Sequence, residues 1–280
     1  MLDIQGFLIK AQAVVCPQCN EVFATPDLAK MTKLTCDSQV ETDLHRVLPD
    51  PFIRSTFVAV CPACLYAWWF AAFAPHYIVA DLVPETPTIE FPKKFALAVL
   101  SGRNNGAHAL DRAMLALNGC WCAREGFVLA GTQDSPEAVA ENTRWLNLAK
   151  QELEEALSDQ EWEGNRNRYQ YILGEVLRQL GEFEAALKYF ESVDRRSMLP
   201  RQLVVHQIKM AQAQHSHPDF LPPHLVEMIF LPKTQVVETL PEQPEPEQTS
   251  QSIAQTSIPQ TQSSAPAEFI NASTPHLIPA

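Results

Sequence analysis

Two patterns of apolar and polar residues divide the chain. Up to about residue 80, β-branched and aromatic residues gather in short runs, which is typical of strands. These runs lie at 6–9, 13–15, 57–60 and 68–73. From about residue 93, apolar residues recur at intervals of three and four, as in amphipathic helices. The order predicts an α+β fold, in which a small β-rich part precedes an all-α part.

The helical part begins with a stripe of four apolar residues at 110, 114, 117 and 121. Ser135 and Pro136 predict the start of a long helix that ends near residue 158, because serine caps helices and proline suits the first position. Two further helices are expected within 164–193, separated near Gly181. Others are expected at 198–213 and 223–230.

The composition changes after Pro232, where proline, glutamine, serine and threonine dominate and no apolar period remains. Such a segment buries too little surface to offset its loss of conformational entropy, so we expect it to be disordered. The predicted organisation is therefore a β-rich domain at 1–90, a helical domain at 91–232 and a disordered tail at 233–280.

The motif Cys-Pro-x-Cys occurs twice, as Cys16 with Cys19 and as Cys61 with Cys64. Doubled pairs of this spacing are typical of tetrahedral metal sites, and four thiolates leave no open position for a substrate. The sequence therefore predicts one structural Zn²⁺ site in a zinc-ribbon-like domain. Iron also suits four thiolates, so the metal stays open. Zinc is favoured because a redox centre would leave the helical half unexplained.

The residue after each second cysteine often needs a positive φ. Asn20 tolerates that conformation, whereas Leu65 does not, so we expect the second turn to match less well. Cys36 stands alone and is expected to be a buried or incidental thiol rather than a further metal ligand. Cys120 and Cys122 lie two residues apart in a helical stretch, where they point to different sides and chelate poorly.

Residues 170–193 resemble a tetratricopeptide repeat (TPR). The match runs through Leu173, Gly174, Leu177, Gly181, Phe183, Ala186, Leu187 and Phe190. Stacked helix pairs leave a concave groove, although a plain helical bundle is the alternative. Polar residues of the first helix that fall outside the repeat positions are expected to be exposed there and to bind a protein partner: Arg168, Glu175, Arg178 and Gln179.

The order of these features resembles a bacterial family of uncharacterised proteins, domain of unknown function 2225. The resemblance covers about residues 8–215: the first cysteine pair, the acidic stretch from Asp37 to Asp43, the second pair, and the repeat-like helices. Tyr66 and Ala67 match the family's usual sequel to the second pair, while Leu65 replaces its usual glycine. The resemblance implies a zinc-ribbon-like part followed by a TPR-like part, and no activity.

Charge and motifs narrow the function. The net charge of −12 argues against nucleic acid as a partner, because phosphates attract basic proteins. The apolar stretch 65–83 is interrupted by Pro75 and His76, which favours a buried strand and turn over a membrane span. Asp3 does not suit a secretory signal, so we expect a cytoplasmic protein.

We find no sequence motif of an enzyme and infer no small-molecule substrate. The favoured function is a non-enzymatic adaptor that binds proteins. A nucleic-acid-binding zinc ribbon and a rubredoxin-like iron redox protein are the alternatives.

Overall fold

The computed structural model describes residues 2–4, 7–31, 39–76, 83–84, 89–159, 165–194 and 200–230. Contacts between Cα atoms divide the chain into two units, and all the described residues lie in the first, Met1–Lys233. The predicted disorder of 233–280 lies outside the described residues, as does Cys36. The expected boundary at residue 90 stays a prediction, since both predicted domains fall within the first unit.

Two small sheets form the N-terminal part. In the larger sheet, β2 (Phe7–Val15) and β3 (Val22–Met31) make a long antiparallel hairpin. Its edges are completed by β1 (Leu2–Ile4) and β6 (Ala74–Pro75), both antiparallel to β2, and by β7 (Val83–Pro84), parallel to β3. The smaller sheet is a second antiparallel hairpin of β4 (Val58–Val60) and β5 (Ala67–Trp69).

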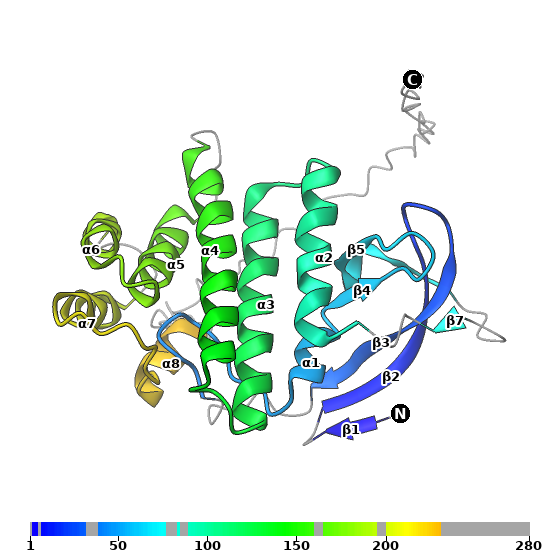
Figure 1. Ribbon diagram of the computed structural model, residues 1–280, viewed down its shortest axis with the longest axis horizontal. Coiled ribbons are helices and arrows are strands. Elements are labelled where there is room, and N and C mark those ends of the chain that lie inside the picture. Colours follow the sequence, from blue (N-terminus) through cyan, green and yellow to red (C-terminus); the bar gives the residue numbers. More distant parts are fainter. Residues whose placement is uncertain are drawn as a thin grey trace, which may run out of the picture. The chain divides into compact units, whose positions relative to one another are not determined.

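From residue 91 onward, the regular elements of the described chain are helices. Short elements precede them in the N-terminal part: α1 (Pro51–Ser55) and the 3₁₀ turn Phe70–Ala72. The helices are α2 (Phe91–Asn104), α3 (Ala109–Leu129), α4 (Pro136–Ser158), α5 (Arg166–Gln179), α6 (Phe183–Ser192), α7 (Arg201–Gln212) and α8 (Pro223–Phe230). Helices α2, α3 and α4 lie side by side in chain order (Figure 1). The main apolar core lies along these helices and α5.

The α+β class is confirmed, because antiparallel hairpins precede the helices. The predicted helices at 136–158, within 164–193, at 198–213 and at 223–230 are confirmed too. The apolar stretch 65–83 forms β5 and the 3₁₀ turn over its first part, and 77–82 lie outside the description. Within the described residues, no helix combines the length and apolarity that a membrane span requires.

The smaller hairpin packs directly on α2. Gly102 makes this approach possible, because a Cβ at that position would lie 2.5 Å from the Trp68 ring. Ser101 Oγ accepts a hydrogen bond of 3.1 Å from the backbone N–H of Ala67. The buried ammonium of Lys94 donates to the carbonyl oxygens of Ser55 and Val58. These contacts fix the second cysteine-bearing hairpin against the helices.

Helices α5 and α6 form the hairpin that the repeat-like pattern predicts. A Cβ at Gly174 would lie 2.7 Å from the Phe190 ring, so the predicted close approach of the two helices is confirmed. Gly181 has φ of +79°, as expected for the residue that ends the first helix.

Candidate metal centre

Both Cys-Pro-x-Cys motifs are the turns of β-hairpins. The first turn joins β2 to β3 between the paired residues Val15 and Val22, and the second joins β4 to β5 between Val60 and Ala67. The backbone hydrogen bonds correspond one to one. The N–H of the first cysteine donates to the carbonyl five residues on, and the N–H four residues on donates back to that cysteine, at 2.8–3.0 Å. The two turns therefore present their sulfurs in the same way.

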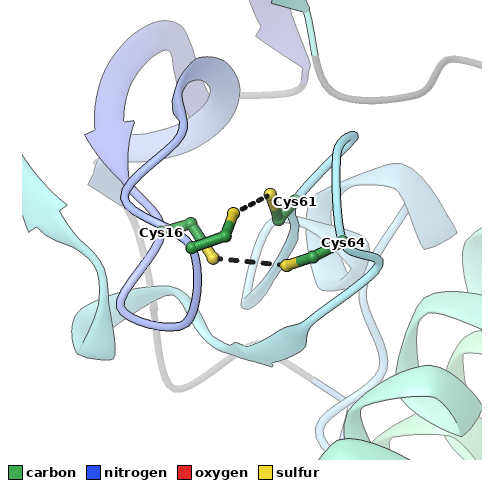
Figure 2. A group of neighbouring side chains, drawn as sticks. Cys16, Cys61 and Cys64 are labelled. Carbon is green, nitrogen blue, oxygen red and sulfur yellow. Dashed lines mark hydrogen bonds between the residues drawn. The ribbon is translucent and has the colours of Figure 1, made fainter.

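The four sulfurs converge between these turns. Cys16 Sγ lies 3.7 Å from Cys64 Sγ, and Cys19 Sγ lies 3.6 Å from Cys61 Sγ. All four lie within 4.8 Å of one another. Figure 2 shows Cys16, Cys61 and Cys64 pointing toward a common centre. A tetrahedral zinc site with Zn–S bonds of about 2.3 Å requires sulfurs about 3.8 Å apart, so this geometry fits a four-thiolate metal ion.

Each turn places one cysteine in the protein and one at the surface. Cys16 and Cys61 are buried, whereas Cys19 and Cys64 are exposed. Burial raises the pKa of the Cys16 thiol and raises that of Cys61 to about 12. The backbone N–H of Glu21 lowers the pKa of Cys19. A metal ion has to displace the protons of the buried thiols, so binding is expected to strengthen as the pH rises.

The second turn matches the first more closely than the sequence suggested. Asn20 has φ of 63° and Leu65 has φ of 60°, so both occupy the left-handed region. The expectation that Leu65 would disturb the second turn is wrong for the geometry. The hairpin hydrogen bonds and the packing of Tyr66 against Phe73 hold the turn, and the leucine side chain, 51% exposed, meets no obstacle. The conformational cost of leucine in this region remains, because its Cβ lies close to the following carbonyl oxygen.

The helical cysteines do not join this centre. Cys120 donates to Asn142 of α4, whereas Cys122 donates to the carbonyl of Pro51. Burial raises the pKa of each thiol to about 12. As predicted, the two point to different sides of α3 and do not chelate together.

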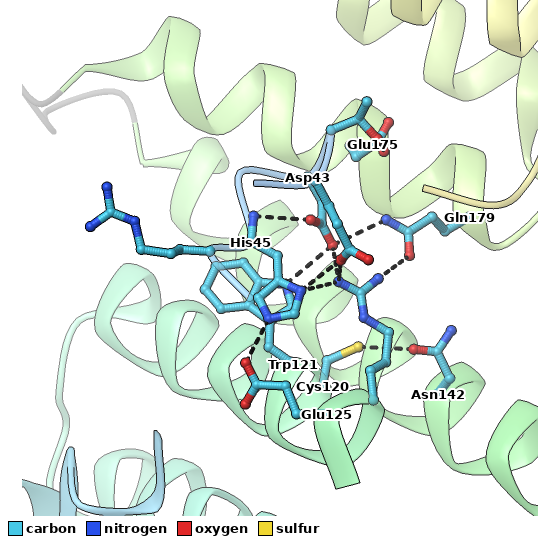
Figure 3. Close-up of polar contacts among 12 residues, drawn as sticks. Asp43, His45, Cys120, Trp121, Glu125, Asn142, Glu175 and Gln179 are labelled. Carbon is cyan, nitrogen blue, oxygen red and sulfur yellow. Dashed lines mark hydrogen bonds and ion pairs between the residues drawn. The ribbon is translucent and has the colours of Figure 1, made fainter. Parts of the chain in front are cut away.

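A second group of potential ligands lies in the segment between the two turns. Glu41, Asp43 and His45 bring one ligand atom each within 4.8 Å of the others. Arg124 of α3 already occupies their centre, because its Nη2 lies 2.6 Å from Glu41, 2.7 Å from Asp43 and 3.0 Å from His45 Nδ1. Figure 3 shows Asp43 and His45 within this group of polar contacts. The guanidinium of Arg124 thus lies where a metal ion would bind. We assign this cluster to the packing of the fold.

A second group of buried charges, centred on Glu125, lies beside the Arg124 cluster. Both carboxylate oxygens of Glu125 accept from Arg54, at 2.7 and 3.0 Å, and one also accepts from the Leu48 backbone N–H. His45 Nε2 lies 2.9 Å from the same carboxylate, and the His45 ring stacks on Trp121 at 5.2 Å. The segment between the cysteine pairs is therefore fastened to α3 by paired charges that are almost wholly buried.

Two of the predicted partner-binding residues are placed wrongly by the sequence pattern. Glu175 and Arg178 are fully buried rather than exposed. They pair with each other, since Arg178 Nη2 and Nε donate to the two Glu175 oxygens at 2.6 and 2.9 Å. Their spacing of three residues brings opposite charges onto one helix face, and the neutralised pair can be buried. Arg168 is exposed, and Gln179 is half-buried and bonded to Arg124.

The chain itself fills the face of α5 that was expected to bind a partner. Thr42 Oγ1 donates to Glu175 at 2.7 Å, and Tyr171 donates to the Thr42 carbonyl at 2.5 Å. Arg178 donates to the carbonyls of His215 and His217. Charged residues in the mainly apolar stretch of α3, Arg124 and Glu125, were the sequence signal that could have indicated the neighbouring buried network around Asp43 and His45.

Comparison of the chain with protein-family models, curated proteins and solved structures finds no match. The assignment of the centre therefore rests on the residues and their geometry.

The positive φ shared by Asn20 and Leu65 leads to a paired prediction. Leu65→Asn should raise the free energy of unfolding by about 1 kcal/mol, because asparagine tolerates the left-handed region better than leucine. Asn20→Leu should lower it by a similar amount. Urea unfolding of the metal-loaded protein measures both. A Leu65→Asn variant no more stable than wild type, beside a destabilised Asn20→Leu, would show that leucine carries no strain here.

Asp43 should make stability depend on acid pH. Burial alone would raise the pKa of Asp43, but Arg124 and His45 more than offset it and lower the pKa to about 2. A depressed carboxyl pKa stabilises the fold above pH 4 and loses this contribution as the pH falls toward 2. The contribution is about 2 kcal/mol, at about 1.4 kcal/mol per pKa unit.

Asp43→Asn should therefore be less stable than wild type at pH 7, and the gap should shrink as the pH falls below 4. Urea unfolding at each pH, with metal content matched, gives the difference. Asp134→Asn, which alters an exposed carboxylate, is the control. An equal gap at pH 7 and pH 3 would contradict the assigned ion pair.

Proposed function

We propose that this chain is a non-enzymatic, metal-stapled protein that binds other proteins, with one Zn²⁺ held by Cys16, Cys19, Cys61 and Cys64. The proposal of a metal rests on one observation: sulfurs of the two turns lie 3.6 and 3.7 Å apart, and the turns have the same backbone hydrogen bonds. A site filled by four thiolates leaves the metal without an open position, which is typical of structural rather than catalytic zinc.

The proposed site has surroundings that suit a stapling role. Val14, Phe23, Ala59 and Phe73 pack around the buried cysteines in a small apolar cluster of their own. Phe23 and Phe73 meet edge to face with ring centroids 5.8 Å apart. Such a cluster is too small to hold two hairpins together without a further crosslink, and a structural metal supplies one.

The role as an interaction protein is supported by the helical half. The α5–α6 hairpin, with its close crossing at Gly174 and its left-handed Gly181, resembles the helix pair that tetratricopeptide-like proteins stack. We propose that it is one tetratricopeptide-like repeat and that the neighbouring helices complete a short stack with it, in line with the tetratricopeptide-like part of the bacterial family that the sequence resembles. Because the chain fills the α5 face, the partner surface has to lie elsewhere on the helices.

Metal content tests the first part of this proposal. Purified protein should contain about one zinc per chain by elemental analysis. Cys16→Ser combined with Cys61→Ser should abolish this zinc and weaken the two hairpins, while the far-ultraviolet circular dichroism of the helices is largely retained.

Cys122→Ser is the matched control, because this thiol is buried but lies outside the centre. It should keep a full complement of zinc. Zinc retained in the double variant would exclude the four-cysteine site. Iron with a visible thiolate absorption band, in place of zinc, would support the rubredoxin-like alternative instead.

A further inference from the structure

An open cleft of about 820 Å³ lies where α2, α3 and α4 meet. Its floor is formed by one stripe of α3 and the residue that caps it: Ala123, Gly126, Phe127 and Ala130. One wall is apolar and comes from the start of α2 and the residues just before it, with Ile89, Phe91 and Pro92. The other is charged and comes from the start of α4, with Glu137, Glu141 and Arg144. Neither the metal centre nor the buried charge network uses this cleft.

Gly126 indicates that the floor is kept open. Glycine weakens a helix relative to alanine, so a glycine inside a helix needs a packing reason. The other described helical glycines have one. A Cβ at Gly102, Gly119 or Gly174 would lie 2.4–2.7 Å from the ring of Trp68, Trp145 or Phe190, respectively. A Cβ at Gly126 would meet only Pro51, at 3.9 Å. The internal packing of the chain does not require glycine there.

The charges of the cleft select its occupant. Arg144 is paired with Glu141 at 2.6 Å, and Lys93 is paired with Glu90 at 2.9 Å. Among the described cations, none forms an ion pair with Glu137. The rim therefore carries a net negative charge beside an apolar floor. A complementary partner presents apolar side chains on one face and a basic residue at its edge.

The dimensions suit a helix. The α3 stripe from Ala123 to Ala130 spans seven residues, or about 10 Å along the axis, which is close to two helical turns. An apolar floor with one apolar and one charged wall is the environment in which an amphipathic helix binds. We propose that this cleft binds a basic amphipathic helix of a partner protein, with an apolar side chain over Gly126 and a cation beside Glu137.

This inference rests on the proposed role as an interaction protein and names the site and the class of partner. The probe is a fluorescein-labelled, 15-residue helical peptide with leucines on one face and lysines elsewhere. Its binding to the full-length, metal-loaded chain is followed by fluorescence anisotropy at physiological ionic strength. A peptide with glutamate in place of lysine is the charge control, and it should not bind.

Two substitutions of one residue separate filling of the cleft from unfolding. Gly126→Ala adds a methyl group that the cleft accommodates, so the peptide should still bind and the protein should be at least as stable as wild type. Gly126→Leu fills the floor and should weaken peptide binding by about ten-fold or more, with zinc content and melting temperature preserved. Equal binding to wild type and Gly126→Leu would overturn the proposal.

A second pair of variants tests the charge. Glu137→Gln should weaken binding of the lysine peptide by about three-fold or more. Glu184→Gln is the matched control, because Glu184 is also an exposed acid in the first turn of a helix, α6. Equal effects of the two substitutions would mean that the peptide senses only net charge, which would also overturn the proposal.

The remaining outcomes identify other occupants. If Gly126→Leu removes binding of the neutral dye Nile red but leaves the peptide bound, the cleft takes a small apolar ligand instead. If it abolishes a dimer seen by sedimentation, the cleft takes a second copy of the chain. Either result rejects a basic helix as the occupant. Zinc content is measured in every variant, so failure of the cleft is distinguishable from failure of the metal centre.

Discussion

The convergence of four cysteine sulfurs from two distant hairpins is the constraint on which the N-terminal part depends. Cys19 and Cys61 lie 42 residues apart in the chain, yet their sulfurs are 3.6 Å apart. Closing a loop of this length costs conformational entropy, and a small apolar cluster around Phe23 and Phe73 has little area with which to offset it. A metal ion bonded to all four sulfurs would close the loop.

The segment between the two turns extends the effect of this closure to the helices. The segment between the two turns carries Asp43, His45 and Arg54, which meet Arg124 and Glu125 of α3. Charges buried this deeply are costly unless each has its partner, so the network tolerates few arrangements of the segment. The hairpins hold the ends of the segment while the charges fix its middle. The N-terminal hairpins and the helices are therefore coupled through this segment as well as through the packing of β4 and β5 on α2.

The sequence predicted those features that local pattern determines. The cysteine spacing indicated the centre, the serine and proline before α4 marked its start, and Gly174 marked a close helix crossing. The sequence pattern failed to predict burial and backbone conformation where these depend on segments distant in the chain. Glu175 and Arg178 fall outside the apolar repeat positions and look exposed, but residues 40–46 and 215–221 cover them. Leu65 adopts a left-handed conformation because its hairpin imposes it. No local pattern contains this information.

Zinc K-edge X-ray absorption of the purified, full-length protein tests the central claim most directly, because it counts the atoms bonded to the metal. The account predicts four sulfur ligands at about 2.3 Å and no nitrogen or oxygen in the first coordination shell. A shell containing nitrogen or oxygen would contradict closure of the centre by Cys16, Cys19, Cys61 and Cys64, as would fewer than four sulfurs.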